Sequence, residues 1–249
     1  MILRLPSRVL SFPRRPLVMG IVNVNDDSFS GDGTLDVDEA LGQAGAQVAA
    51  GADIVDLGAE SARTNRAAIP VEEECARLRG VLERWGEVTA STGPRDDEQV
   101  WPPVLSVNTW RSEVVVAALG LGAELINDMG GLPDGRNARL VAEHGAALLL
   151  MHTAGPPKVQ RVDQSWDDIM EELERFFEDK LAVAQSEGLS PDQLVIDPGI
   201  DFAKQREDNL RLLRELDRLQ QFERPVLLPV SRKTVIGEVL EIEDPVARD

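Results

Sequence analysis

A short phrase recurs along this chain and constrains its fold more than any other feature of the sequence. A helical segment ends in Gly-Ala and leads into an apolar run with polar residues at its end, at 49–57, 120–128 and 143–152. The glycine can adopt the left-handed conformation that ends a helix, and the apolar run is typical of a strand buried on both faces. Such strands alternating with helices predict parallel βαβ units.

The same pattern extends over the whole chain. Strands are predicted at 17–24, 53–58, 104–108, 124–128, 147–152, 194–197 and 226–231. The helices between them include 36–50, 71–85, 137–144, 166–188 and 205–222, while 90–103 is predicted to be a polar loop. Seven βα units within 249 residues predict one α/β domain, residues 1–249, of the (β/α)8 TIM barrel type, with the eighth unit not evident.

The predicted helix 166–188 carries one apolar stripe at steps of three and four residues. Its members are Ile169, Met170, Leu173, Phe176, Phe177 and Leu181. A stripe of this kind packs on a core or on a partner subunit more often than it lines a cofactor site. We therefore expect it to pack on the barrel or on a second subunit.

Charge and composition exclude several classes of function. The formal net charge of −18 opposes binding to nucleic acid or to an anionic membrane, and no apolar run reaches the length of a membrane span. The single cysteine, Cys75, cannot form an intramolecular disulfide, which is typical of a cytoplasmic protein. The first 25 residues contain four arginines and no acid, but their prolines argue against a transit peptide. We interpret them as a lead-in to the first strand.

Each predicted strand ends in, or is followed by, a polar residue. The residues are Asn23, Asp56, Glu60, Asn108, Asn127, Asp128, His152, Asp197, Ser231, Arg232 and Lys233. Taken singly, an Asp or Asn at such a place can be a helix cap or a turn residue. Because the carboxyl ends of barrel strands share one rim, where barrel enzymes have their active sites, the set predicts a functional mouth.

The segments around these strand ends resemble the signatures of the dihydropteroate synthase family. The matching segments are 19–30, 56–63, 126–128, 150–152, 196–204 and 231–233, in the family's order and over roughly residues 16–240. The resemblance implies a pterin-binding TIM barrel. It also implies a transferase of folate biosynthesis, which joins 6-hydroxymethyl-7,8-dihydropterin pyrophosphate to p-aminobenzoate and releases pyrophosphate.

The resemblance also implies roles for individual residues. Asp197 would accept two hydrogen bonds from the pterin, with Asn108, Asn127 and Lys233 as further polar contacts. Met151 and Phe202 would border the flat ring. His152 would have a supporting role, whereas His144, at a helix end, is interpreted as structural.

The other implied roles concern the pyrophosphate and the second substrate. Asn23 would help to hold Mg²⁺ on the pyrophosphate, and Arg63 and Lys233 would complete the catalytic set with it. The pocket for p-aminobenzoate would involve Phe29, Ser231 and Arg232. Departure of pyrophosphate followed by attack of the arylamine requires no nucleophilic side chain.

Four departures from the family pattern bear on activity. Asn108 replaces an Asp that contacts the pterin, and Asp201 replaces a Gly, which puts a side chain beside the pterin pocket. Ala62 and Thr64 replace a Thr and a Pro in the second loop. The family's last strand, with its phosphate-binding Arg and His, is not evident. Truncation, completion by another chain, and edge pairing by residues 2–12 are three explanations, of which we favour the first. We expect this chain as given to be impaired in activity and stability.

Two rival hypotheses remain at this point. One is a catalytically impaired or silent pterin-binding paralogue. The other is a pterin-binding domain of a corrinoid-type methyltransferase, which Asn108 favours, whereas 27–29 and 231–233 favour the synthase. By resemblance a homodimer through outer helices is also predicted.

Overall fold

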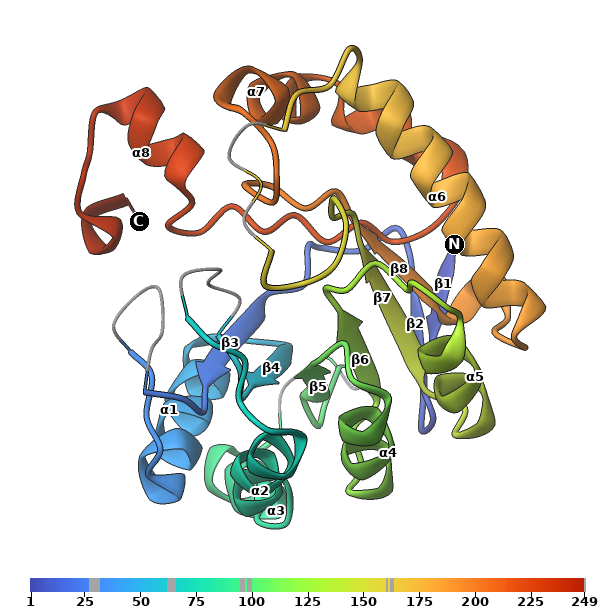
Figure 1. Cartoon of the computed structure of the whole chain (residues 1–249). Coiled ribbons are helices and arrows are strands. Elements are labelled where there is room, and N and C mark those ends of the chain that lie inside the picture. The colour runs from blue at the N-terminus through green and yellow to red at the C-terminus, as the bar shows by residue number, and fades with distance from the viewer. Residues whose placement is uncertain are drawn as a thin grey trace.

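Six parallel strands form the centre of the molecule. The computed structural model describes residues 1–26, 32–61, 66–94, 97, 100–159, 161 and 164–248. Within these residues the sheet has the order β3-β4-β5-β6-β7-β8, so each strand pairs with its successor in the chain (Figure 1). The strands are β3 (Met19–Asn23), β4 (Ile54–Gly58), β5 (Val104–Asn108), β6 (Leu125–Asp128), β7 (Ala147–Met151) and β8 (Leu194–Asp197).

Helices follow the strands and cover the outside of the curved sheet (Figure 1). They are α1 (Val37–Ala50), α2 (Val71–Leu82), α3 (Trp85–Thr92), α4 (Ser112–Gly120), α5 (Arg136–Glu143), α6 (Ile169–Ser186), α7 (Arg206–Arg214) and α8 (Thr234–Leu240), with 3-10 turns η1 (Pro191–Gln193), η2 (Leu216–Phe222) and η3 (Pro245–Arg248). This sequential parallel order confirms the predicted barrel class. No helix of the described segments is long and apolar enough to cross a membrane.

Alternate residues of each strand face two different cores. Val55 and Leu57 of β4 belong to the large cluster between the sheet and the helices, whereas Ile54 belongs to a second, inner cluster. The α6 stripe packs in the large cluster, as predicted, with Ile169, Met170 and Phe177 fully buried. Side chains of odd and even positions along a strand therefore have different functions: one set fixes the helices and the other fills the barrel interior.

The first residues form a hairpin, so our prediction of a simple lead-in was wrong. β1 (Ile2–Arg4) pairs antiparallel with β2 (Val9–Ser11) and not with an edge of the large sheet. Its Leu3 and Leu10 are buried in the inner cluster, together with Ile54, Val104 and Leu125 from the barrel strands. The hairpin covers the end of the barrel opposite the predicted mouth. Without it, the apolar residues of the inner cluster would be exposed to water, which is unfavourable.

Leu10 tests this closure. Its side chain is fully buried, so Leu10→Ala should lower the free energy of unfolding by about 3 kcal/mol. The neighbouring Val9 is 38% exposed and serves as the control, because Val9→Ala should cost less than about 1 kcal/mol. Urea unfolding measures both variants; equal, small losses would show that the hairpin does not close the core.

Two predicted helices differ from the structure. The helix predicted at 71–85 ends at Leu82, and a separate helix, α3, continues to Thr92 inside the segment predicted as a polar loop. The helix predicted at 205–222 ends at Arg214 and continues as the 3-10 turn η2. The tighter turn allows Phe222 to lie edge-on to Phe177 of α6, with 5.7 Å between ring centroids. Tertiary packing, which periodicity does not report, decided this second boundary.

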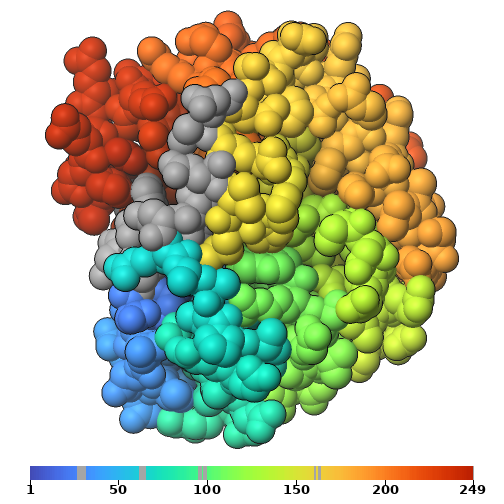
Figure 2. All heavy atoms as spheres, viewed as in Figure 1, coloured from blue at the N-terminus to red at the C-terminus, as the bar shows by residue number. Residues whose placement is uncertain are grey.

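The seventh strand, predicted at 226–231, is reduced to one bridge between Val226 and Ile196. Ile196 donates to the Pro225 carbonyl at 3.0 Å, and Leu227 donates to the Ile196 carbonyl at 2.9 Å. The prediction of a regular strand was wrong beyond these bonds, because Pro225 and Pro229 lack the N–H that a strand ladder requires. The chain then enters α8, which contacts α7 (Figures 1 and 2).

Candidate active site

A row of polar side chains lies at the carboxyl ends of the strands. The strand register pairs Asn23 with Gly58, Gly58 with Asn108, and Asn108 with Asn127. Three of the predicted site residues therefore stand in one cross-strand row, on three different strands. Asp56 and Ser106 lie one step below this row on the same face, and below them the inner face is apolar, with Ile54 and Val104 in the inner cluster. The barrel interior therefore changes from hydrocarbon to polar groups at the predicted mouth.

Asp56 of β4 is the centre of the first polar group. Its carboxylate accepts a hydrogen bond from the Ser106 hydroxyl at 2.5 Å and one from the Asn127 amide at 2.9 Å, and it also interacts with the Asn108 amide. Burial raises the pKa of Asp56 to about 6, although these three hydrogen bonds act in the opposite direction. Asn108 lacks the negative charge of the aspartate that it replaces, but Asp56, which interacts with its amide, carries a carboxylate.

Sequence reasoning named Asp56 as a strand end but did not include it among the site residues. The spacing within the predicted strands was a partial signal, since Asp56 lies two residues after Ile54, and Asn108 lies two residues after Ser106; the pairing of Asp56 with Ser106 is known only from the structure. Residues two apart on a strand share a face, so all three belong to the inner face.

Asp197, at the end of β8, is the centre of the second polar group. One carboxylate oxygen accepts the Gly199 backbone N–H at 2.7 Å, so Asp197 also caps the turn after β8. Burial raises the pKa of Asp197 to about 6, opposed by the Gly199 bond and by the positive charges of Lys233 and Lys204. A carboxylate with this pKa is largely ionised at neutral pH.

Lys204 fixes the loop that follows Asp197. Its buried ammonium donates to His152 Nδ1 at 2.8 Å, to the Gly199 carbonyl at 2.9 Å and to the Phe202 carbonyl at 3.2 Å. Burial lowers its pKa to about 7. Gly199 has a φ of 67°, and a Cβ there would stand 2.1 Å from the His152 carbonyl oxygen, so only glycine fits.

His152 is buried behind the loop that follows Asp197 and bonded to Lys204. It is fully buried between the rings of Trp166 and Phe176, at centroid distances of 5.6 and 4.8 Å. Burial, and then the nearby Lys204 charge, lower its pKa well below the usual value, so the imidazole is neutral. Because Lys204 donates to Nδ1, the ring hydrogen is on Nε2, 3.9 Å from the Glu172 carboxylate.

Lys233 lies beside the second group. Its ammonium stands 4.7 Å from the centroid of the Phe202 ring, a cation–π arrangement, and it interacts electrostatically with Asp197. Burial lowers the pKa of Lys233, and the attraction of Asp197 and then Asp201 opposes this. Met151 is buried in the inner cluster, and Phe202 packs against that cluster. The structure thus brings together four predicted residues: Met151, Asp197, Phe202 and Lys233.

Asn23 and Arg232 meet through Asp32. The Asn23 amide donates to one Asp32 carboxylate oxygen at 3.2 Å, and the Arg232 guanidinium lies 3.8 Å from the other. These contacts join the loop after β3 to the segment after Val230, on the side of the barrel where the six-stranded sheet ends. Ser231 is exposed next to this contact. Phe29 and Arg63 lie outside the described residues.

Two polar strand ends serve the helices instead of the mouth. Asp128 is fully buried and accepts the Gly130 N–H at 2.8 Å and the Asn137 amide of α5 at 2.9 Å. His152 packs against Phe176 of α6. The prediction that all the polar ends converge on one rim therefore fails for these two, because consecutive strand residues point to opposite faces.

An ion-pair network that we did not predict ties the loops after β4 and β5 together. Arg111 contacts Glu60 at 2.6 Å and Glu74 of α2 at 2.5 Å, and Lys158 lies 3.5 Å from Glu60. Thr109 donates to Glu74 at 2.8 Å. Both glutamates are buried, so the network holds three loops in one arrangement next to the second signature segment.

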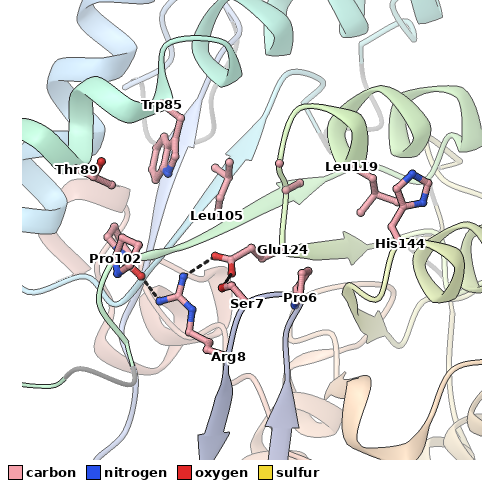
Figure 3. A pocket seen from close by; sticks show the side chains of 13 residues that line it. Pro6, Ser7, Arg8, Trp85, Thr89, Pro102, Leu105, Leu119, Glu124 and His144 are labelled. Atoms are coloured by element: carbon pink, nitrogen blue, oxygen red, sulfur yellow. Dashed lines mark hydrogen bonds and ion pairs between the residues drawn. The ribbon is translucent and has the colours of Figure 1, made fainter.

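The hollow at the opposite end of the strands has a different character. Figure 3 shows this space of about 470 Å³ between the hairpin, α3 and α4, lined by Trp85, Thr89, Pro102 and Leu119. Its polar groups engage one another: Arg8 bonds the Pro102 carbonyl and Glu124, and Ser7 donates to Glu124. The polar groups of this hollow therefore already have partners within the protein. The carboxyl ends of the strands remain the candidate active site.

Among the described residues no group of three or more His, Cys, Asp or Glu side chains is placed to hold a metal ion. Two oxygen-bearing side chains, Asn23 and Asp32, do lie together at the mouth. Mg²⁺ commonly takes one or two protein oxygens and completes its shell with water and substrate phosphates. The pair therefore fits a Mg²⁺ ion shared with a phosphorylated substrate.

A parallel barrel with buried carboxylates and amides at the carboxyl ends of its strands has the architecture of a barrel enzyme, and the match to a known family gives the class, the pterin-binding enzymes. Residues 19–249 match the family model described as pterin binding enzyme. The dihydropteroate synthase of Escherichia coli (strain K12) is 35% identical over 228 residues, covering 91% of this chain and 77% of the relative. That of Bacillus subtilis (strain 168) is 34% identical, covering 94% and 76%. The chain belongs to the dihydropteroate synthase family.

Solved structures agree with this assignment. The dihydropteroate synthase of Thermus thermophilus in complex with 4-aminobenzoate superposes with a TM-score of 0.81 at 38% identity, covering 100% of this chain and 85% of that one. The Yersinia pestis enzyme, solved with a sulfonamide drug complex, gives a TM-score of 0.86 at 33% identity, with the same two coverages. Both likenesses extend over the whole of this chain.

Proposed function

We propose that this chain is a transferase that condenses 6-hydroxymethyl-7,8-dihydropterin pyrophosphate with p-aminobenzoate, giving 7,8-dihydropteroate and pyrophosphate. The observation that carries the proposal is the mouth of the barrel, where two buried carboxylates, Asp56 and Asp197, stand among amides and beside Lys233. A pterin presents an amino group and a ring N–H side by side, which a carboxylate accepts as a two-pronged pair. The names of the relatives agree with this chemistry.

In this proposal Asp197 binds the pterin edge, Asn108 and Asn127 contact the same ring, and Asp56 holds both amides in place. Lys233 and Phe202 border the ring, with Met151 beneath it. As the C–O bond to pyrophosphate breaks, positive charge develops on the pterin, and the fixed carboxylates stabilise it. The arylamine nitrogen then forms the new C–N bond and releases one proton to solvent.

The pyrophosphate side of the site involves Asn23, Asp32 and Arg232. Asn23 and Asp32 would hold Mg²⁺, which supplies charge neutralisation of the leaving group when bound. Arg63, by resemblance, adds positive charge, and so does Arg232 beside Asp32. Phe29, Ser231 and Arg232 would contact p-aminobenzoate, so Arg232 would lie between the two substrates. The Mg²⁺ ion and the two arginines would offset, at the site, the repulsion between a pyrophosphate and a protein with a net charge of −18.

Titration calorimetry with pterin pyrophosphate, combined with an assay of pyrophosphate release on addition of p-aminobenzoate, tests the function. We expect pterin binding that strengthens with Mg²⁺, and release that requires the arylamine. Binding without release would indicate a silent paralogue, and methyl transfer from an added methylated pterin, in place of release, would indicate the methyltransferase class. Absence of pterin binding would defeat all three.

The assembly and location of the protein are further parts of the proposal. We expect a homodimer through outer helices, as the family resemblance implies, and a cytoplasmic location consistent with a single cysteine. Sedimentation equilibrium measures the first, since a 27.2 kDa species at micromolar concentration would contradict a dimer.

A further inference from the structure

Asp201 connects two loops of the mouth that are far apart in the chain. Its carboxylate accepts the backbone N–H of Thr234 at 2.5 Å and that of Val235 at 3.3 Å, the first two residues of α8. The sequence predicted a side chain beside the pterin pocket at this position. The structure gives this side chain a definite set of partners, which are backbone groups of the segment that carries Lys233.

Asp201 is itself held from α7. Its own N–H donates to the Asn209 side-chain oxygen at 2.9 Å, and the Asn209 amide lies 3.3 Å from the Asp201 carboxylate. Asn209 is buried and also donates to the Lys204 and Gln205 carbonyls. The contacts therefore form a continuous chain from α7, through Asp201, to the start of α8.

The backbone at Asp201 adopts a conformation that glycine would reach without strain. Its φ is 67°, in the left-handed region where a side chain is disfavoured. The two hydrogen bonds that the Asp201 carboxylate accepts from the start of α8 offset the cost of this backbone conformation.

Lys233 immediately precedes the residues that Asp201 binds. Two neighbouring residues therefore hold Lys233 in place. Asp201 binds the backbone of Thr234, the residue after Lys233, and the centroid of the Phe202 ring lies 4.7 Å from the Lys233 ammonium. In the segment before Lys233, Val226 forms a bridge to the sheet, and the Arg248 guanidinium donates to the Arg232 carbonyl at 3.3 Å. The loop after β8 acts on Lys233 itself and on the residue that follows it.

We propose that Asp201 is a positioning residue that holds Lys233 over the pterin-binding mouth by binding the start of α8. The proposal rests on the function proposed above, because it assigns the positioned lysine to the pterin. Asp201 acts through Lys233 and touches no substrate itself. Its effect should therefore vanish when Lys233 is already absent.

A double-mutant cycle of Asp201→Asn and Lys233→Met tests this directly. We expect Asp201→Asn to reduce kcat/KM for pterin pyrophosphate by about 10- to 100-fold, and to change it less than about threefold in the Lys233→Met background. The matched control is Glu238→Gln, which removes one charge from the exposed face of α8 and should leave kcat/KM unchanged. Additive losses in the double variant would overturn the proposal.

Hydrogen exchange without substrate separates failure of this inference from failure of the proposed function. The Thr234 and Val235 amides should exchange about tenfold faster in Asp201→Asn than in the unmodified protein or in Glu238→Gln. Unchanged exchange would overturn the proposal even if the enzyme is active, whereas faster exchange in a protein that binds no pterin would contradict only the function. Should Asp201→Asn fail to fold, Asp201→Gly, which relieves the strained φ, carries the same expectations.

Discussion

Asp197→Asn is expected to reduce kcat/KM for pterin pyrophosphate by about two to three orders of magnitude while making the protein more stable at neutral pH. Asparagine keeps an oxygen for the Gly199 N–H, so the loop remains in place. It removes the negative charge and the second acceptor of the two-pronged pair, and charge-assisted bonds contribute about 1.5–3 kcal/mol each. Steady-state kinetics at saturating p-aminobenzoate measures the loss.

The gain in stability follows from the pKa of Asp197. Burial raises this pKa from 3.8 to about 6, so the folded state binds a proton more tightly than the unfolded state. The group's favourable contribution is complete below pH 3.8 and is lost as pH rises through 6. Above that pH the ionised carboxylate destabilises the fold, and its removal should raise the free energy of unfolding by up to about 3 kcal/mol.

Asp128→Asn is the matched control for activity. Asp128 is equally buried, and burial likewise raises its pKa to about 6, but its carboxylate binds Gly130 and α5 on the helix side of the sheet. We expect its pterin affinity to remain within about threefold of the unmodified protein. Equal losses of affinity in the two variants would mean that Asp197 acts through the fold and not through the ligand.

Lys204→Met is expected to shift the acidic limb of the pH–rate profile to higher pH and to destabilise the protein. The positive charge of Lys204 lowers the pKa of Asp197, so its removal should raise that pKa above 6. At a given mildly acidic pH the variant would then have a larger fraction of protonated Asp197. The profile of kcat/KM against pH measures the shift, and an unmoved limb would show that Lys204 does not influence Asp197.

The same substitution leaves His152 Nδ1 and the Gly199 and Phe202 carbonyls without their donor. We expect a loss of about 3 kcal/mol in the free energy of unfolding, reduced at neutral pH because methionine does not incur the cost of burying a charge. The pKa of Lys204 falls from 10.5 to about 7 on folding, so the unfolded state binds the proton more tightly. Its contribution is complete above pH 10.5 and is lost as pH falls through 7.

Unfolding by urea at several pH values tests this second effect. The unmodified protein should gain stability between pH 7 and 10.5 by up to about 1.4 kcal/mol per pH unit from this one group, and Lys204→Met should lack that component. Lys180→Met is a suitable control, because Lys180 is a lysine of α6 remote in the chain from the mouth loops and next to Asp179. A slope that persists in Lys204→Met would contradict the assignment.

The sequence by itself determined the class of fold, the strands and most of the mouth. Buried apolar runs with a polar end predicted the six regular strands to within a few residues, because a strand that is covered on both faces has a composition that few other structures share. The ordered signature segments led to Asn23, Asn108, Asn127, Asp197 and Lys233. These residues lie at the carboxyl ends of strands or in the loops after them, which chain order alone dictates in a parallel barrel.

Only the tertiary structure decided which polar groups face one another. Asp56 and Asp197 acquire their raised pKa values from burial, and burial depends on residues distant in the chain. The hairpin at the end opposite the mouth, the irregular segment after Val226 and the Asp201 contact with α8 likewise depend on partners far along the chain. Local sequence patterns report periodicity and turn chemistry, whereas these features depend on which atoms exclude water from one another once the barrel has formed.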